Sequence, residues 1–310
     1  MTPPLSIVIE TFNATPESNV QLQDVLARLR RQSLSWDDME ILVVVEEQHR
    51  DLADFVRRIE PAAKVILTSD PTYYGMKRTG MKEARGDVVA LLDSDCLPVE
   101  DWAREILSTI SGGADVVAGR VRFPSDSLFA RTFAVFDYGH LRNGSDGQAP
   151  CFNVSNAGLR REVARDHPFD ARLTRFGGGT LLGRKLKSLG FKIVYNPAAA
   201  VEHTDKGVRK HLLVRFRTGH EAVELCRLDR DNVLPETKLM RFGLAAPFLF
   251  AARRFAFDCQ SILANRRDME IAWFETPYFM AASMLVRSAE VTGGAVSIVK
   301  PGYLAKRFGW

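Results

Sequence analysis

Short apolar runs alternate with amphipathic stretches along the first third of the chain. Residues 19–33 carry apolar side chains at mostly three- and four-residue spacings, which is typical of an amphipathic helix. A basic stretch at 75–85 also has helical character. Mostly aliphatic runs predict buried strands at 6–9, 41–45, 64–67 and 88–92. Buried strands separated by helices favour an α/β fold with a mostly parallel, Rossmann-like sheet and flanking helices.

Carboxylates follow three of these strands at the point where each strand ends. The segments are Glu10-Thr11-Phe12-Asn13, Glu46-Glu47 and Asp93-Ser94-Asp95. Because ligands of such sheets bind beyond the carboxyl ends of the strands, we expect these side chains to share one rim. Like charges on one rim repel each other, and a bound cation would relieve that repulsion. Acidic residues are also common in turns, so a DxD sequence alone is a weak signal.

The spacing of Asp93 and Asp95 has a geometric consequence. Residues i and i+2 that leave an extended strand point to the same side, so both carboxylates can face one ligand. Hard oxygen donors suit Mg²⁺ or Mn²⁺ and leave coordination positions for water and phosphate oxygens. The pattern therefore predicts a divalent metal ion that binds a nucleoside diphosphate group.

Composition and charge divide the chain in two. Of its 310 residues, 46% are hydrophobic and 26% charged, which excludes a disordered or low-complexity chain. Residues 206–310 carry 17 Lys/Arg and 10 Asp/Glu, a net charge of +7. Because the whole chain carries +4, residues 1–205 carry 4 − 7 = −3. We expect one domain at 1–205 and a basic, largely helical extension at 206–310.

The cysteines and the apolar runs bear on the cellular compartment. The four cysteines lie far apart without a CxxC pair, so we expect neither a disulfide framework nor a structural zinc site, and a cytoplasmic location is favoured. No basic segment followed by an apolar core opens the chain, so no signal peptide is expected. The longest wholly apolar run, 244–252, has nine residues, against the roughly 20 that span a bilayer, so an integral membrane protein is not expected.

Several segments, in a fixed order, resemble the family-two glycosyltransferases with the GT-A fold. The resemblance covers residues 1–205, and its segments are Thr11-Phe12-Asn13, Val43-Val44-Val45-Glu46-Glu47, Ala84-Arg85-Gly86-Asp87, 91–98, 156–162 and 197–203. It implies transfer of a sugar from a UDP- or GDP-sugar to a hydroxyl of a saccharide or lipid-linked acceptor, usually with inversion. It also implies a divalent metal ion, Mn²⁺ or Mg²⁺, and a place in polysaccharide biosynthesis.

The resemblance implies residue roles as well. The nucleotide sugar would be bound by Thr11, Asn13, Glu46, Glu47, Lys77, Asp93 and Ser94. The metal would be held by Asp95, Asp93 and His203, and the acceptor side would include Asn156 and Arg160. Taken alone, Lys77 fits a solvated helix face equally well, and a single histidine such as His203 is more often structural.

The general base of this family is missing from its usual position. The family commonly places Glu-Asp before a helix, with the second residue as the base, and the aligned residues here are Gly178 and Gly179. Another carboxylate could serve, or the acceptor could need no base, or the chain could bind a nucleotide sugar without turning it over. The candidates for a substitute base are Asp170, Glu202 and Asp205.

The two glycines also have interpretations without catalysis. Glycine-rich turns are common before helices, and this one would be a flexible turn capped by Thr180. Alternatively, bare backbone amides at the start of the helix would hold an anionic group of the acceptor.

Residues 206–310 combine basic segments with apolar and aromatic ones. A basic helix is predicted at 206–230, and aromatic or aliphatic side chains recur at 244–255, 277–286 and 300–310. Such segments pack as a helical subdomain or a homodimer interface, or they lie in the interface of an anionic membrane, here the inner face of the cell membrane. The small net charge and the lack of a dedicated motif argue against a nucleic-acid partner.

Two rival functions are weighed against glycosyl transfer. A catalytically weak homologue that binds nucleotide sugars would explain Gly178 and Gly179. A sugar-1-phosphate nucleotidylyltransferase has a similar sheet, but it needs an early glycine-rich loop with a basic residue, which this sequence does not contain.

Overall fold

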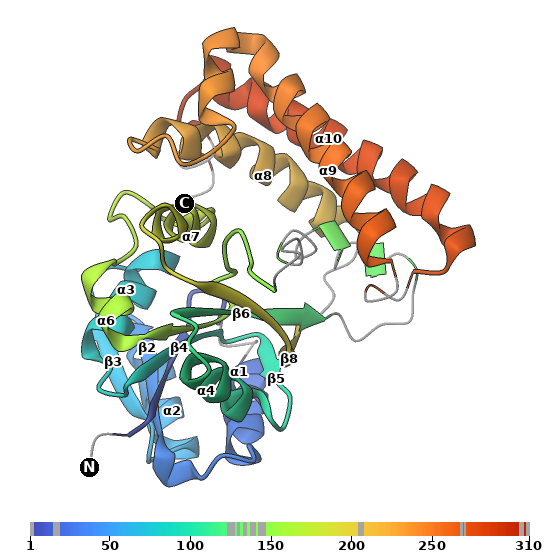
Figure 1. The fold of residues 1–310 in the computed structure, drawn as a ribbon. Coiled ribbons are helices and arrows are strands. Elements are labelled where there is room, and N and C mark those ends of the chain that lie inside the picture. The colour runs from blue at the N-terminus through green and yellow to red at the C-terminus, as the bar shows by residue number, and fades with distance from the viewer. Residues whose placement is uncertain are drawn as a thin grey trace. The chain divides into compact units, whose positions relative to one another are not determined.

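The computed structural model describes residues 3–14, 19–122, 128, 131, 132, 135, 136, 141, 147–203, 208–266, 269, 271–303 and 307 (Figure 1). The chain divides into two compact units. The first contains Met1–Pro124 and Asp146–Thr204, and the second contains Ser125–Ser145 and Asp205–Trp310. The segment 125–145, which the sequence pattern assigns to the first domain, is thus grouped with the second unit.

A mixed sheet forms the centre of the first unit. Its strands among the described residues are β1 (Leu5–Glu10), β2 (Met39–Glu46), β3 (Lys64–Thr68), β4 (Val88–Asp93), β5 (Cys96–Pro98), β6 (Val116–Arg122), β7 (Asn156–Arg160) and β8 (Ile193–His203). They lie in the order β3-β2-β1-β4-β7-β6-β8-β5. The first four strands pair in parallel, and so do β6 and β8. Strand β7 is antiparallel to both of its neighbours, and β5 is antiparallel to β8.

Helices flank this sheet (Figure 1). They are α1 (Asn19–Arg30), the 3-10 turn η2 (Trp36–Asp38), α2 (Arg50–Ile59), α3 (Tyr73–Glu83), α4 (Trp102–Ser111), α6 (Arg161–Asp166) and α7 (Gly178–Ser188). Helix α3 lies so close to β1 and β2 that a Cβ atom at Gly80 would overlap the side chain of Val8. Because side chains alternate along a strand, Glu10 points to the same face of β1 as Val8, under α3.

The α/β fold predicted from the sequence is confirmed. All four predicted strands are present: β1 and β2 extend beyond the predicted residues at both ends, and β3 and β4 extend by one residue at the carboxyl end. Helix α1 ends at Arg30, three residues earlier than the periodicity indicates, and α2 was not predicted. The buried side chains of α2 are Leu52, Ala53 and Val56, so a helical spacing was present but short.

The second unit is helical, as predicted. Its elements are α8 (Val208–Leu228), η4 (Thr237–Ala245), α9 (Ala246–Asn265), η5 (Trp273–Glu275) and α10 (Thr276–Val299). Helix α10 packs against both α8 and α9 (Figure 1). Gly219 and Gly293 permit the close approach of α8 and α10, because a Cβ atom at either position would overlap a carbonyl group of the facing helix.

Buried ion pairs join the three long helices. Arg287 of α10 donates to Asp258 of α9 at 2.8 and 2.9 Å and to Glu290 at 2.6 Å. Glu290 also accepts from Arg215 of α8 at 3.3 Å and from Arg254 of α9 at 3.2 Å. Burial alone would raise the pKa of Glu290, but the three arginines overcome it and lower this pKa to about 2.

Two observations concern membranes and thiols. No helix in the described part of the chain is long and apolar enough to cross a bilayer. Among the described residues, Cys96, Cys151, Cys226 and Cys259 form no disulfide bond.

Candidate functional site

The carboxyl ends of β1, β2 and β4 lie side by side at one edge of the sheet. Glu10, the last residue of β1, pairs in register with Val44 on one side and with Asp93 on the other. Glu46 ends β2 and pairs with Thr68 of β3. The structure therefore brings the three acidic strand ends to one rim.

Two side chains of α3 hold Asp93. Its carboxylate accepts from the Lys77 ammonium at 2.8 Å and from the Tyr73 hydroxyl at 2.8 and 3.0 Å. Tyr73 and Lys77 are separated by one helical turn, so they share a face of α3. The helix begins after Thr72, whose hydroxyl accepts from the amide of Gly75 at 3.0 Å. Lys77 is completely buried, so the interpretation of this residue as part of a solvated helix face is wrong.

The Glu10 carboxyl group is buried beside this pair. Its Oε2 accepts from the amide of Phe12 at 2.6 Å, and its Oε1 has no hydrogen-bond partner among the described residues. Burial and then the charge of Asp93 raise the pKa of Glu10 to about 8, although Lys77 acts in the opposite direction. Glu10 is therefore mostly protonated at neutral pH. It lies next to the Asp93–Lys77 ion pair, whose opposite charges cancel.

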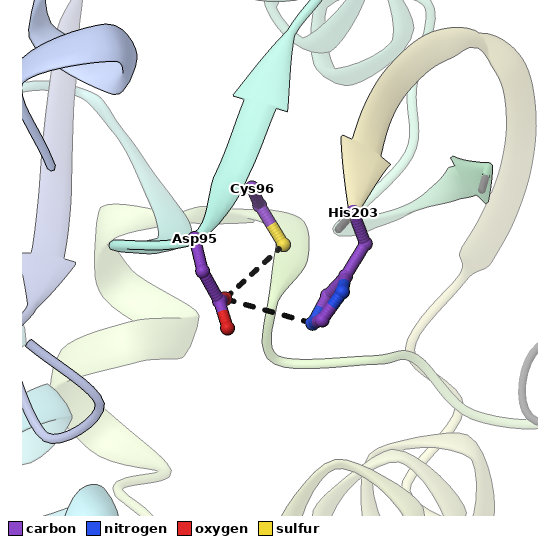
Figure 2. A group of neighbouring side chains, drawn as sticks. All are labelled: Asp95, Cys96 and His203. Atoms are coloured by element: carbon purple, nitrogen blue, oxygen red, sulfur yellow. Dashed lines mark hydrogen bonds and ion pairs between the residues drawn. The ribbon is translucent and has the colours of Figure 1, made fainter. Parts of the chain in front are cut away.

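The side chains of Asp95, Cys96 and His203 lie close together (Figure 2). Asp95 is two residues beyond the end of β4, in the turn before β5. Strand pairing brings them together, because His203 at the end of β8 faces Cys96 of β5 in register. Nε2 of His203 lies 3.6 Å from an oxygen of Asp95, and the Cys96 thiol donates to the same oxygen at 3.9 Å. The three candidate ligand atoms lie within 4.8 Å of one another, and all three side chains are buried.

This group fits a divalent metal ion. A carboxylate oxygen and an imidazole nitrogen are both common ligands of divalent metals, and their separation is one that a single ion can bridge. Asp93 is not a member of the group, because Lys77 and Tyr73 hold its carboxylate. The roles of Asp95, Asp93 and His203 as metal ligands stay predictions, and the geometry favours Asp95 and His203.

The other residues predicted to bind the nucleotide sugar lie near the same rim. The Thr11 hydroxyl is buried and donates to the carbonyl of Val44 at 2.8 Å, so this group helps to fix the end of β1. Ser94 is buried in the turn between β4 and β5. Asn13 and Glu46 are half-buried, and Glu47 is exposed. Their roles in donor binding stay predictions.

Close packing explains the glycines at the start of α7. A Cβ atom at Gly178 would overlap the ring of Tyr74, and one at Gly179 would overlap the carbonyl oxygen of Phe152. The Gly178 amide donates to the Tyr74 hydroxyl at 2.7 Å, so it does not face an open anion site. The N-cap is Gly177 with a φ of 76°, and Thr180 lies inside the helix, so the interpretation of Thr180 as the cap is wrong.

The three substitute bases differ in their surroundings. Asp170 accepts from the Arg172 side chain at 2.5 and 2.9 Å, which makes it part of a local ion pair. Glu202 precedes His203 on β8, so it points to the opposite face of the strand, and it lies 3.8 Å from Arg28. Asp205 lies outside the described residues. The identity of the base stays open.

The two residues predicted on the acceptor side are engaged within the fold. The Asn156 side chain donates to the carbonyls of Arg120 and Ala199 at 2.8 and 2.9 Å and accepts from Trp102 at 2.8 Å. Arg160 donates to the carbonyls of Ala114 and Ile110 at 3.0 and 2.9 Å. The Asn156 bonds link β7 to β6, β8 and α4, and the Arg160 bonds link the end of β7 to α4 and the loop after it. The acceptor role of either residue stays a prediction.

Sequence reasoning missed Tyr73, Tyr74 and Cys96. The four-residue spacing of Tyr73 and Lys77 is a signal that could have paired them, because both then face Asp93. Nothing in the sequence indicates that Tyr74 binds Gly178 or that Cys96 faces His203, because both contacts depend on how distant elements pack.

Comparisons with known proteins give a consistent result. The family model described as Glycosyl transferase family 2 matches residues 6–167, just over half of the chain. Glycosyltransferase AglE of Haloferax volcanii is 25% identical over 239 residues, which cover 74% of this chain and 77% of that protein.

Two solved structures share the fold. Mannosyltransferase PcManGT from Pyrobaculum calidifontis, in complex with GDP-Man and Mn²⁺, superposes with a TM-score of 0.61 at 18% identity, covering 97% of this chain and 88% of that one. GalNAc-T7, with UDP, GalNAc and Mn²⁺, superposes with a TM-score of 0.51 at 14% identity, covering 66% and 44%. These likenesses confirm the GT-A class of fold.

Proposed function

The chain belongs to glycosyl transferase family 2 and is a glycosyltransferase, and from this premise we propose that it transfers a sugar from a nucleoside-diphosphate sugar to a hydroxyl of a saccharide or lipid-linked acceptor. The diphosphate of the donor would bind Mn²⁺ or Mg²⁺ at Asp95 and His203. The observation that carries this proposal is the separation of 3.6 Å between these two buried side chains at the carboxyl edge of the sheet.

The residues of the rim have different roles in binding an anionic donor. When bound, the metal ion supplies positive charge to the departing nucleoside diphosphate. Asp95 and His203 hold the ion, while Lys77 neutralises Asp93 at 2.8 Å and burial keeps Glu10 mostly protonated. The net negative charge that faces the diphosphate is thereby small, which lowers the electrostatic cost of binding it.

A second candidate function is binding of a nucleotide sugar with little turnover. The observation that favours it is the packing at Gly178 and Gly179, where no acidic side chain fits without displacing Tyr74 or the backbone at Phe152. A base from another carboxylate, for which Asp205 is a candidate, or an acceptor that needs no base would instead restore turnover.

Release of nucleoside diphosphate from UDP- and GDP-sugars, with a panel of saccharide acceptors and Mn²⁺, tests both functions. We expect release by the wild type, a loss of at least about 100-fold in Asp95→Asn, and no change in the matched control Asp166→Asn, whose side chain is exposed. Metal-dependent binding without release would support the second function. No metal-dependent binding of any nucleotide sugar would contradict the proposal.

We also propose that the second unit binds the surface of an anionic membrane. Of the 24 residues of α10, only Arg287 and Glu290 are charged, and both are buried in ion pairs. The exposed face just before and along the first half of α10 is apolar, with Trp273 75% and Phe274 68% exposed. Aromatic side chains on an uncharged helix face are typical of membrane interfaces, and the net charge of +7 over 206–310 would attract anionic lipid.

Flotation with anionic and with neutral vesicles tests this association. We expect the wild type to float with anionic vesicles, and Trp273→Ser with Phe274→Ser to lower the bound fraction at least about tenfold. The matched control is Leu189→Ser in the first unit, where the side chain is 56% exposed. Equal flotation of the double variant, or a stable dimer that the double variant dissociates, would contradict the proposal and favour the homodimer interface.

A further inference from the structure

The Cys96 thiol lies within 4.8 Å of the candidate ligand atoms of Asp95 and His203, the two proposed metal ligands. Cys96 is completely buried, and Figure 2 shows its sulfur and the imidazole of His203 both facing the same oxygen of the Asp95 carboxylate. The register between β5 and β8 fixes this arrangement, because Cys96 and His203 face each other across an antiparallel pair. The backbone therefore holds the sulfur near the ion site before any ion binds.

The distances suit a metal with mixed ligands. In a tetrahedral site with Zn–S of about 2.3 Å and Zn–N or Zn–O of about 2.1 Å, neighbouring ligand atoms lie roughly 3.4–3.6 Å apart. The His203–Asp95 separation of 3.6 Å already matches, and the Cys96–Asp95 separation of 3.9 Å differs by a few tenths of an ångström. Small side-chain rotations are enough to bring all three ligand atoms, now within 4.8 Å, onto one ion.

We propose that Cys96 is a third ligand of the ion at Asp95 and His203, and that this site binds thiophilic ions such as Zn²⁺, Co²⁺ and Cd²⁺ more tightly than Mn²⁺ or Mg²⁺. The proposal rests on the proposed function, since it assumes the same ion site. Thiolates favour softer ions, whereas carboxylate-only sites favour Mg²⁺ and Mn²⁺. On coordination the thiol loses its proton to the solvent and the thiolate sulfur bonds to the ion.

Three protein ligands leave one position open in a tetrahedral site. That position is the one that a diphosphate oxygen of the donor would take.

Optical titration of the metal-free, full-length protein with Co²⁺ tests the proposal without an activity measurement. We expect a thiolate-to-cobalt charge-transfer band in the near ultraviolet for the wild type. The band should be lost in Cys96→Ser and kept in the control Cys259→Ser, a cysteine of α9 in the second unit. Competition between ions should show Zn²⁺ affinity lowered at least about tenfold in Cys96→Ser, and Mn²⁺ affinity changed by less than about threefold.

The outcomes separate this proposal from the proposed function. Binding of Co²⁺ to the wild type without a charge-transfer band overturns the role of Cys96 and leaves the site at Asp95 and His203 intact. No binding of any divalent ion, with or without a nucleoside diphosphate, contradicts the proposed function itself. If Cys96→Ser does not fold, the wild-type cobalt spectrum decides alone, and binding of Co²⁺ without a thiolate charge-transfer band overturns the proposal.

Discussion

The ammonium nitrogen of Lys77 lies 2.8 Å from a carboxylate oxygen of Asp93, and both side chains are buried. This pair distinguishes the two aspartates of the DxD segment, because Asp93 has an internal cation while Asp95 lies beside His203. Removing one partner of a buried ion pair strongly destabilises a fold, because the other charge is left buried without compensation. The contact therefore supports the rim on which the proposed donor site depends.

Removing the Lys77 cation should lower the stability of the fold. We expect Lys77→Met to lower the free energy of unfolding by about 3–5 kcal/mol, because Asp93 is left charged and buried, and the added change Asp93→Asn should recover part of that loss. Urea denaturation measures both. The control is Lys64→Met, whose exposed pair with Glu83 at 3.0 Å should contribute less than about 1 kcal/mol. A loss of under 1 kcal/mol in Lys77→Met would contradict this account of the pair.

Restoring a side chain at the usual position of the base should destabilise the fold. We expect Gly179→Ala to lower the free energy of unfolding by about 1–3 kcal/mol, because its Cβ atom would overlap the Phe152 carbonyl oxygen. Thermal unfolding measures this. Gly112→Ala is the matched control, since the nearest heavy atom there is 3.3 Å away. Wild-type stability in Gly179→Ala would contradict the steric account, and wild-type stability in Gly179→Asp would show that an acidic residue fits and would reopen this position for catalysis.

The raised pKa of Glu10 predicts a loss of stability toward alkaline pH. Below about pH 4.5 the carboxyl is neutral in both the folded and the unfolded state. Between this pH and about 8 the unfolded chain ionises first, so stability falls by up to ~1.4 kcal/mol per pH unit. We expect Glu10→Gln to flatten this decline, measured by unfolding in EDTA from pH 4.5 to 9. Parallel curves for wild type and variant would refute the assignment.

Glu290 predicts the opposite trend. Its pKa is lowered to about 2, so the stability that it contributes is fully present above about pH 5 and is lost as the pH falls toward 2. We expect Glu290→Gln to be less stable than the wild type by on the order of 3 kcal/mol at pH 7, with the difference shrinking below pH 4.5. Circular dichroism during acid titration measures it. A difference that does not depend on pH would argue against the arginine pairs as its cause.

Local patterns in the sequence were sufficient to predict the four parallel strands and the acidic ends of three of them. Buried parallel strands read as continuous apolar runs, and the side chains that follow them must meet at one rim. The antiparallel strands β5 and β7 were harder to predict from the sequence, because each is short and its partner is distant in the sequence. The fold class was therefore predictable, and the pairing that unites Asp95 with His203 was known only by resemblance.

The candidate site, too, was only partly predictable from the sequence. Asp95 and His203 followed from motif positions, whereas the burial of Lys77, the protonation of Glu10 and the position of Cys96 all depend on the packing of α3 and β8 on the sheet. In the sequence, the glycines at the start of α7 indicate only that the usual general base is missing. Their steric cause, the contacts with Tyr74 and Phe152, needs three-dimensional coordinates.

The most direct test of the proposed donor site is calorimetric titration of UDP and GDP into the protein with Mn²⁺, repeated in EDTA. We expect one nucleoside diphosphate to bind only in the presence of the metal, with affinity reduced at least about tenfold in Asp95→Asn and in His203→Gln. Metal-dependent binding of undiminished affinity in both variants would place the ion elsewhere and contradict the account.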